Sequence, residues 1–325
     1  MATVEIAFLH GQLEERKKRL EAAMAGAPHN DGLAHLLREV DSALQRMDKG
    51  TYGLCDVCHD SVEKDRLLAD PLVRYCLDHL SEEQRIALQR DLDLAAQVQR
   101  KLLPEANLRV DGWETSYHYS PVGPVSGDYC DLIPSNGHLF FALGDVSGKG
   151  VAASMLMTQL HALFRGLAGM NLPLGQMVAQ ANRVFCESAL AGLYATLVCG
   201  QTKPNGEVEI HNAGHWPAVL VGRGGVLRIE STGLPLGMFH DTEFAATRVQ
   251  LAPGDTLFLY TDGLCEARDT SGAEYGVERV MRLVRQNAAR IPRELITASL
   301  DDLRAFSGAA SRLDDLTLLA IRRQA

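Results

Sequence analysis

Four short acidic motifs recur across the C-terminal two-thirds of this chain, and they constrain its fold more than any other feature. They are GDYCD at 127–131, GDVSGKG at 144–150, TDG at 261–263 and LDDLT at 313–317. Each sets an aspartate at a strand edge or in a turn, where small neighbours let a carboxylate approach a cation closely. Because Mg²⁺ and Mn²⁺ prefer oxygen ligands drawn from separate segments, the array predicts a two-metal hydrolase site.

The order and setting of these motifs resemble the SpoIIE/RsbU-like branch of metal-dependent serine/threonine protein phosphatases, the PPM family. The resemblance covers roughly residues 92–322 and includes HNAGHWPAVL at 211–220 and TGLPLGMF at 232–239. An isolated Asp-Gly would be weak support because turns use it widely, but six ordered matches are specific. The resemblance implies an α+β fold, a phosphatase β-sandwich flanked by helix pairs.

The resemblance also implies ligands for two Mn²⁺ or Mg²⁺ ions per catalytic domain. Asp145 would bridge the two ions, Asp262 and Asp314 would complete one site, and Asp128 with the backbone carbonyl of Val146 would serve the other. Two cations about 3.5–4 Å apart lower the pKa of a bridging water and neutralise a phosphate ester. The four aspartates are therefore the expected catalytic residues.

Other polar residues near these motifs have weaker roles. Asp131 and Asp315 are auxiliary ligands, acceptors that orient water, or simple turn caps. Three histidines could protonate a leaving serine oxygen: His118, His211 and His215. The alternative is a structural role, because a histidine in a strand usually satisfies a local hydrogen bond. The branch is thought to lack the arginine that clamps phosphate in eukaryotic relatives. No substitute is evident, so metals and backbone are expected to capture the phosphate.

A second metal motif precedes the acidic ones. Cys55-x2-Cys58 and Cys76-x2-His79 form two paired-ligand knuckles suited to one tetrahedral Zn²⁺. Residues 37–79, and GTYGLCDVC at 50–58 in particular, resemble the zinc finger of the DksA/TraR family. His79 stands where a fourth cysteine is usual, and AGAPHND at 25–31 replaces an acidic tip motif. The resemblance to the DksA/TraR finger therefore implies zinc binding but not binding to RNA polymerase. The zinc is expected to be structural, and a redox or metal-sensing role is the alternative.

Helical periodicity dominates the remaining N-terminal third. Two apolar stripes predict an antiparallel helical hairpin, and their expected role is packing between the two helices. The first stripe is Ile6, Leu9, Leu13 and Leu20, and the second is Leu33, Leu37, Val40, Leu44 and Met47. Residues 81–103 form a charged linker helix that Pro104 ends. Its heptad, with Leu88, Leu92, Ala95 and Leu102, carries Gln99 at an a position. A polar a residue fixes coiled-coil register, which favours a homodimer; a surface helix buried along one stripe is the alternative.

Beyond Pro104 the pattern changes to alternating strands and turns. The predicted strands span 113–120, 127–133, 139–146, 194–201, 208–212, 218–221, 226–230, 247–251, 256–260 and 316–321. The predicted helices span 150–167, 174–190, 273–287 and 292–306. The domains expected are a hairpin with a zinc finger at 1–80, a coiled-coil linker at 81–104 and a phosphatase domain at 105–325.

Composition excludes several classes of function. No apolar run in the 325 residues approaches the roughly 18 of a membrane span, the N-terminus lacks a signal-peptide pattern, and a cytoplasmic protein is expected. A net charge of −9 argues against broad binding to nucleic acid. The seven cysteines do not form a secreted disulfide framework; four outside the finger are expected to be buried small hydrophobes: Cys130, Cys186, Cys199 and Cys265.

Two functions of different classes follow. The preferred one is a phosphatase whose zinc finger and linker regulate it, acting by family resemblance on a phosphorylated STAS-type anti-anti-sigma factor in a partner-switching pathway. The other is a transcription-associated binding protein whose finger docks on RNA polymerase or another partner and whose phosphatase fold is a scaffold. All four core aspartates are retained, which argues against an inactive scaffold.

Overall fold

The computed structural model describes residues 3–26, 31–80, 82–135, 137–170, 172–189 and 192–324. The chain divides into two compact units, Met1–Asp91 and Leu92–Ala325. Ser81, most of the predicted hairpin tip and the side chain of Ile6 lie outside the described residues. Within the described part of the chain, every helix is too short or too polar to span a lipid bilayer.

The first unit contains the predicted helical hairpin. Helices α1 (Thr3–Gly26) and α2 (Asp31–Asp48) pack together, and α3 (Lys64–Ala69) and the 3-10 helix η1 (Leu77–His79) follow. Their apolar stripes meet in a core that includes Leu9, Leu13 and Val40. Cys55 and Cys76 belong to the same core, so the hairpin and the cysteine loops fold as one small body.

Helix α4 (Glu82–Leu102) is the predicted linker, and it ends close to where Pro104 predicts. Its C-terminal half belongs to the second unit, where Ala96 and Gln99 are buried. Leu94 and Val98, on another face of the same helix, are 59% and 61% exposed. The helix therefore has one face against the second unit and one free apolar face.

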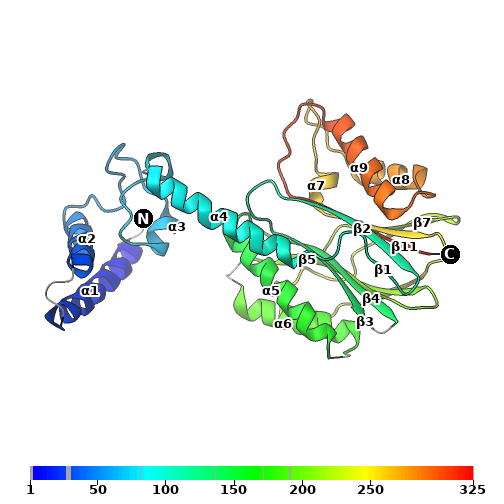
Figure 1. The fold of residues 1–325 in the computed structure, drawn as a ribbon, viewed down its shortest axis with the longest axis horizontal. Helices are drawn as coiled ribbons and strands as arrows, with labels where there is room; N and C mark the ends of the chain where they lie inside the picture. The colour runs from blue at the N-terminus through cyan, green and yellow to red at the C-terminus, as the bar shows by residue number, and fades with distance from the viewer. Residues whose placement is uncertain are drawn as a thin grey trace. The chain divides into compact units, whose positions relative to one another are not determined.

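The second unit is built on two antiparallel sheets (Figure 1). One sheet has the order β1 (Arg109–Val110), β2 (Trp113–Ser120), β11 (Leu316–Arg323), β10 (Thr256–Tyr260), β7 (Ala218–Gly222) and β8 (Gly225–Ile229). The other has the order β3 (Asp128–Ser135), β4 (His138–Val146), β5 (Ala195–Thr202), β6 (Glu207–Ala213) and β9 (Ala246–Gln250). The predicted strands are all present, with ends shifted by a residue or two.

Three apolar layers hold the second unit together. Inward-facing side chains of both sheets, including Trp113, Phe141 and Leu319, form the central layer. Helices α5 (Val151–Ala168) and α6 (Leu174–Ser188) cover the outer face of the five-stranded sheet, and α8 (Val277–Gln286) and α9 (Pro292–Ser307) cover the six-stranded sheet (Figure 1). This arrangement confirms the predicted sandwich flanked by helix pairs.

Candidate functional site

Strand pairing brings the acidic motifs to one end of the sandwich. Asp128 begins β3 and lies opposite Asp145 near the end of β4. Asp262 follows β10 directly and begins the short helix α7 (Asp262–Cys265), while Asp314 lies just before β11, which pairs with β10. Motifs more than a hundred residues apart therefore meet where the two sheets face each other.

Asp128 joins the two sheets through its carboxylate. Its Oδ2 accepts hydrogen bonds from the hydroxyls of Thr261, at 3.0 Å, and Thr317, which belong to the other sheet. Its Oδ1 is buried and has no hydrogen-bond partner among the described residues. Burial, and then the charge of Asp145, raise the pKa of Asp128. A buried carboxylate oxygen without a donor is costly, so this atom suits a cation or a cation-bound water.

Asp145 and Asp262 line a cavity of about 380 Å³ together with His215 and Trp216. Burial, followed by the charges of neighbouring aspartates, raises the pKa of Asp145 to about 8. Burial and Asp314 raise the pKa of Asp262 to about 6. Clustered carboxylates that resist ionisation are the expected electrostatics of a site that binds cations.

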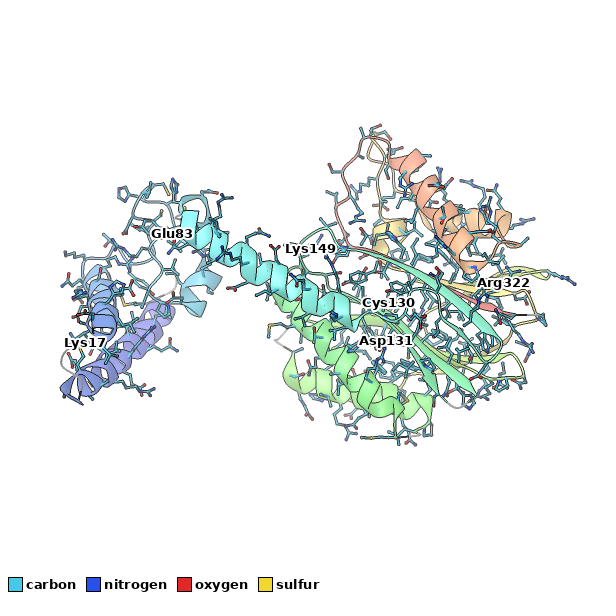
Figure 2. The ribbon with its side chains drawn as sticks, viewed as in Figure 1. Lys17, Glu83, Cys130, Asp131, Lys149 and Arg322 are labelled. Carbon is cyan, nitrogen blue, oxygen red and sulfur yellow. The ribbon has the colours of Figure 1, made fainter. Side chains whose placement is uncertain are left out.

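Lys149 is a cation at this site whose role the sequence analysis did not identify. Its ammonium donates to Asp314 Oδ2 at 2.8 Å and to the carbonyl of Leu313 at 2.9 Å. It also lowers the pKa values of Asp145 and Asp262, against the larger effect of burial. The side chain is 68% exposed (Figure 2). An exposed ammonium beside the carboxylates can turn toward an incoming phosphate, and its place in the GDVSGKG turn was the available sequence signal.

Two glycines let backbone segments approach at the site. A side-chain carbon on Gly127 would lie 3.0 Å from the carbonyl oxygen of Val146 and 3.4 Å from Asp145 Oδ1. One on Gly263 would lie 1.9 Å from the carbonyl oxygen of Asp315, which is a severe overlap. The glycines of the GDYCD and TDG motifs thus keep space around the Val146 carbonyl and between the Asp262 and Asp315 loops.

The two auxiliary aspartates have different environments. Asp315 accepts the backbone N–H of Val122 at 2.7 Å and the hydroxyl of Ser126 at 2.6 Å, so it anchors the loop that leads into Asp128. Asp131 is buried and forms a bidentate ion pair with Arg165 of α5, at 2.9 and 2.6 Å. Asp131 therefore serves the packing of α5 rather than the acidic cluster.

The three candidate histidines are poor proton donors. His215 is bonded through Nδ1 to the Thr196 hydroxyl, at 2.8 Å, and through Nε2 to the carbonyl of Tyr260, at 3.1 Å. Burial lowers its pKa to about 4, so it is neutral at physiological pH. His211 has the Phe244 carbonyl at Nδ1. His118 lies in a separate pocket on the six-stranded sheet.

Gln99 is buried in the second unit and reaches the acidic cluster through Ser126, which differs from the coiled-coil position predicted for it. Its amide donates to the carbonyl of Ser126 at 2.8 Å and accepts the backbone N–H of Ser126 at 3.0 Å. The Ser126 hydroxyl in turn donates to Asp315 and accepts the N–H of Asp128 at 3.0 Å. Helix α4 is thereby linked to the acidic cluster through one residue. The heptad missed this partner because it lies in a loop distant in sequence.

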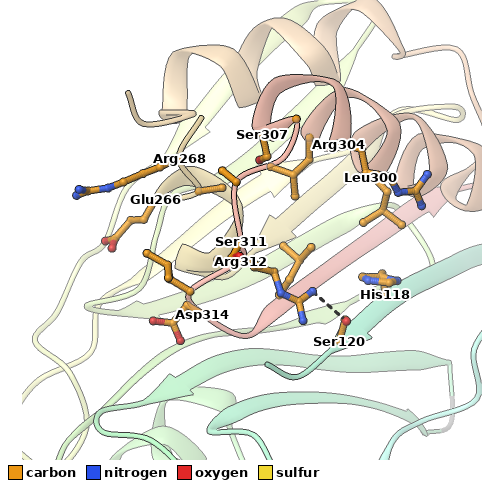
Figure 3. A pocket seen from close by; sticks show the side chains of 17 residues that line it. His118, Ser120, Glu266, Arg268, Leu300, Arg304, Ser307, Ser311, Arg312 and Asp314 are labelled. Atoms are coloured by element: carbon orange, nitrogen blue, oxygen red, sulfur yellow. Dashed lines mark hydrogen bonds between the residues drawn. The ribbon is translucent and has the colours of Figure 1, made fainter. Parts of the chain in front are cut away.

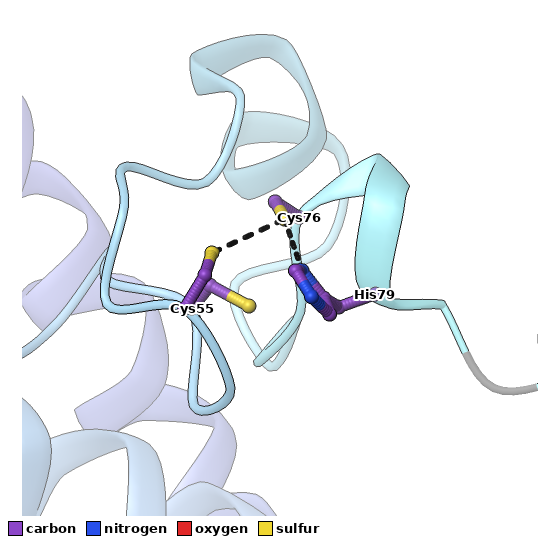
Figure 4. A group of neighbouring side chains, drawn as sticks. Cys55, Cys76 and His79 are labelled. Atoms are coloured by element: carbon purple, nitrogen blue, oxygen red, sulfur yellow. Dashed lines mark hydrogen bonds between the residues drawn. The ribbon is translucent and has the colours of Figure 1, made fainter.

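The first unit carries the predicted cysteine–histidine cluster. Ligand atoms of Cys55, Cys58, Cys76 and His79 all lie within 4.8 Å of one another. Cys58 Sγ is 3.7 Å from Cys76 Sγ, and Cys76 Sγ is 3.2 Å from His79 Nδ1 (Figure 4). Burial tends to raise the pKa of Cys55, but hydrogen bonds from backbone N–H groups outweigh it and lower the pKa, which favours the thiolate. The cluster fits a zinc finger.

The two candidate metal sites differ in how tightly their potential ligands are gathered. The closely spaced metal-binding group within the described residues is the cysteine–histidine set. The four aspartates converge on one end of the sandwich without forming such a compact group. The arrangement can hold cations, while the sharing of two cations among these carboxylates belongs to the proposal below.

An antiparallel double sheet covered by helix pairs, with acidic side chains at one end, defines the PP2C phosphatase fold. This chain is similar to the SiaA-PP2C domain of Pseudomonas aeruginosa, with a TM-score of 0.65 and 20% sequence identity. The match covers 73% of this chain and 97% of that one. Residues 135–324, more than half of the chain, match the family model "Stage II sporulation protein E (SpoIIE)". The chain therefore belongs to the SpoIIE family.

Two curated relatives extend the comparison. Protein IcfG of Synechocystis is 26% identical over 263 residues, which are 72% of this chain and 41% of IcfG. Phosphoserine phosphatase RsbU of Bacillus subtilis is 24% identical over 242 residues, 73% of this chain and 71% of RsbU. The chain thus spans less than half the length of IcfG. Residues 50–78 match the prokaryotic dksA/traR C4-type zinc finger. His79, which stands where that family has its fourth cysteine, lies just beyond the match.

Proposed function

We propose that this chain is a Mn²⁺- or Mg²⁺-dependent protein phosphatase that hydrolyses phosphoserine or phosphothreonine on a regulatory protein. The observation that carries the proposal is the convergence of Asp128, Asp145, Asp262 and Asp314 at one end of a PP2C-type sandwich. RsbU, which shares this domain, is a phosphoserine phosphatase.

The proposed ligands are distributed over both sheets. Asp145 would bridge two cations, Asp262 and Asp314 would hold one of them, and Asp128 with the Val146 carbonyl would hold the other. The buried, unpartnered Oδ1 of Asp128 supports this assignment. When bound, the cations supply an acidified water and neutralise charge on the phosphate.

The chain's own residues then orient the phosphoryl group. If Asp314 held a cation, the Lys149 ammonium that donates to it here would be free to donate to a phosphate oxygen instead. The first N–H groups of α5 follow Lys149 directly, and a helix N-terminus favours an anion. His215 is neutral and bonded at both ring nitrogens, so it shapes the cavity wall and moves no proton.

The substrate is proposed to be a phosphorylated anti-anti-sigma factor of the STAS type, in a partner-switching pathway that regulates a sigma factor. The support is membership in the SpoIIE family and similarity to RsbU. The proposed domains are residues 1–80, 81–104 and 105–325. The first holds one structural Zn²⁺, and the free apolar face of α4 at Leu94 and Val98 favours a homodimer through the linker.

The test is phosphate release from a panel of phosphoserine-bearing anti-anti-sigma proteins by the full chain with Mn²⁺. Asp145→Asn should abolish release. Asp241→Asn, the same chemical change at an exposed position, should leave it intact. If the wild-type chain released no phosphate from any member, and instead bound RNA polymerase through the finger, the scaffold reading would replace this one.

A further inference from the structure

A second cavity adjoins the acidic cluster and is unused by the proposed chemistry. It has a volume of about 780 Å³ and lies between β2, α7, α9 and the loop 308–315; we call it the α9 pocket. Gly263 and Asp314 line it, so its wall is continuous with the acidic cluster. A chain bound with its phosphate at the aspartates would lay its neighbouring residues in this pocket.

Three arginines and two acids, Glu266 and Asp314, line the pocket, so its lining has an excess of positive charge although the whole chain carries a net charge of −9. Arg268, Arg304 and Arg312 line the pocket from three different segments, together with His118 (Figure 3). Burial, and then Arg312 and Arg304, lower the pKa of His118. His118 therefore lies in the positive electrostatic field of two guanidinium groups. A field of this sign is expected of a pocket that receives an anion.

Arg312 is held so that its charge stays available. Its Nη1 donates to the Ser120 hydroxyl at 2.9 Å and its Nη2 to the carbonyl of Pro121 at 2.7 Å (Figure 3). Both acceptors are neutral, and its Nε is buried with no hydrogen-bond partner in the described residues. A fixed guanidinium with neutral acceptors orients toward a carboxylate without giving up an existing ion pair.

Arg268 and Arg304 are bound more loosely. Arg268 pairs with Glu274 at 2.8 Å and Arg304 with Asp301 at 2.7 Å, and all four side chains are more than half exposed. Exposed pairs of this kind contribute little and exchange readily. Both arginines can therefore leave these partners for a carboxylate on a bound chain.

An apolar surface lies among the charges. Leu300 and Leu303 of α9 line the pocket. Leu313, adjacent to Asp314, is 69% exposed at its edge. An exposed leucine beside a metal-binding residue loses water-contacting area when an apolar side chain covers it.

We propose that the α9 pocket binds the segment of the substrate next to the phosphorylated residue and selects acidic residues together with an apolar one. The inference rests on the proposed phosphatase function and adds to it the chemistry of the recognised sequence. Because Gly263 and Asp314 join the pocket to the acidic cluster, the selected positions are those that flank the phosphoserine directly.

The experiment compares phosphoserine peptides that differ only in having glutamate, alanine or lysine at these flanking positions, with an apolar residue kept constant. The full chain with Mn²⁺ should hydrolyse the glutamate peptide with a kcat/KM at least about tenfold above that of the lysine peptide, equivalent to about 1.4 kcal/mol. p-Nitrophenyl phosphate, which has no flanking residues, serves as the reference substrate.

Variants then locate the preference. Arg268→Gln combined with Arg304→Gln should reduce the glutamate-to-lysine ratio by about tenfold, since each lost charge contact is worth up to about 1 kcal/mol. Arg293→Gln, an exposed arginine of α9 that does not line the pocket, should leave the ratio unchanged. Arg268→Glu with Arg304→Glu should favour the lysine peptide.

The outcomes separate the two proposals. Equal kcat/KM for all three peptides, or a preference that persists when Arg312→Gln is added to the double glutamine variant, overturns the α9 pocket assignment and leaves the phosphatase standing. Hydrolysis of p-nitrophenyl phosphate without hydrolysis of any phosphopeptide overturns the α9 pocket assignment, whereas the phosphatase proposal is overturned by the absence of phosphate release from the phosphoprotein panel. A ratio that falls in the double variant, with Arg293→Gln unaffected, establishes the pocket as the determinant of sequence preference.

Discussion

Replacing Gln99 with leucine tests whether the linker helix supports the metal site. The change removes both hydrogen bonds between the side-chain amide and the backbone of Ser126 and leaves a buried N–H and a buried carbonyl without their partners. Each net bond contributes about 0.5–1.5 kcal/mol, so the loop loses about 1–3 kcal/mol of positional stability. Ser126 also contacts Asp315 and the N–H of Asp128, and the loss therefore reaches a proposed metal ligand.

If about half of that free energy is expressed in cation binding, Gln99→Leu should raise the Mn²⁺ concentration for half-maximal activity about two- to tenfold, at about 1.4 kcal/mol per factor of ten. The assay is phosphate release across a Mn²⁺ titration, with sedimentation mass measured in parallel. Gln97→Leu is the matched control, because Gln97 is exposed two residues away on the same helix.

The two roles of Gln99 give different results. Support of the metal site changes the Mn²⁺ requirement at constant mass, whereas a register-setting role in a coiled coil changes the mass or the stability of a dimer. An unchanged Mn²⁺ titration, with the same response in Gln97→Leu and Gln99→Leu, would refute the coupling of α4 to the acidic cluster.

Four further outcomes are expected. Asp145→Asn should reduce turnover at saturating Mn²⁺ more than about tenfold without unfolding the domain; a smaller loss would contradict its bridging role. Lys149→Met should raise both KM for phosphoprotein and the inhibition constant of inorganic phosphate about tenfold with a smaller change in kcat, and equal constants would exclude phosphate contact. Cys55→Ser combined with Cys58→Ser should release the one zinc per chain detected by elemental analysis, and unchanged zinc would remove the finger from the account. In the folded, metal-free protein the pKa is about 8 for Asp145 and about 6 for Asp262, above the value of about 3.9 for an unfolded aspartate. Folding without metal therefore takes up protons, and the free energy of unfolding falls as pH rises through the window from about 4 to about 8. The metal-free melting temperature should decline across it, with Mn²⁺ stabilising more at its upper end; a flat profile would contradict the clustered carboxylates.

Local periodicity was sufficient to predict most elements of the sandwich. Strands β2 and β10 match their predicted ranges, because period-2 alternation ends at clear turn residues. Helix α7 was missed because its four residues are too few to show a helical period. The two-residue β1 was missed for the same reason. Which strands are neighbours in each sheet was also beyond periodicity, since pairing depends on contacts between distant segments.

The site residues likewise fall into those that a local sequence pattern reveals and those that only contacts between distant segments reveal. The acidic motifs and the cysteine pairs were identified because chemistry at short spacing is visible in a sequence. Asp131 could not be assigned between cluster and core until Arg165 was placed against it. Lys149 and Arg312 were overlooked because a single basic residue acquires meaning only from the segments that fold around it, here the loop at Leu313 and the end of β2.

Helix α4 shows why its heptad admitted two interpretations. Ala96 and Gln99 are buried against the second unit, while Leu94 and Val98 remain exposed. A helix with apolar residues on two faces can pack on its own domain and still offer a seam to another copy, but the exposed face at Leu94 and Val98 is not the predicted seam, whose residue Gln99 is buried on its own domain. What the structure adds is the direction of coupling: any rotation of α4 that a partner imposes must move Gln99. It would then shift the Ser126 loop that orients Asp128.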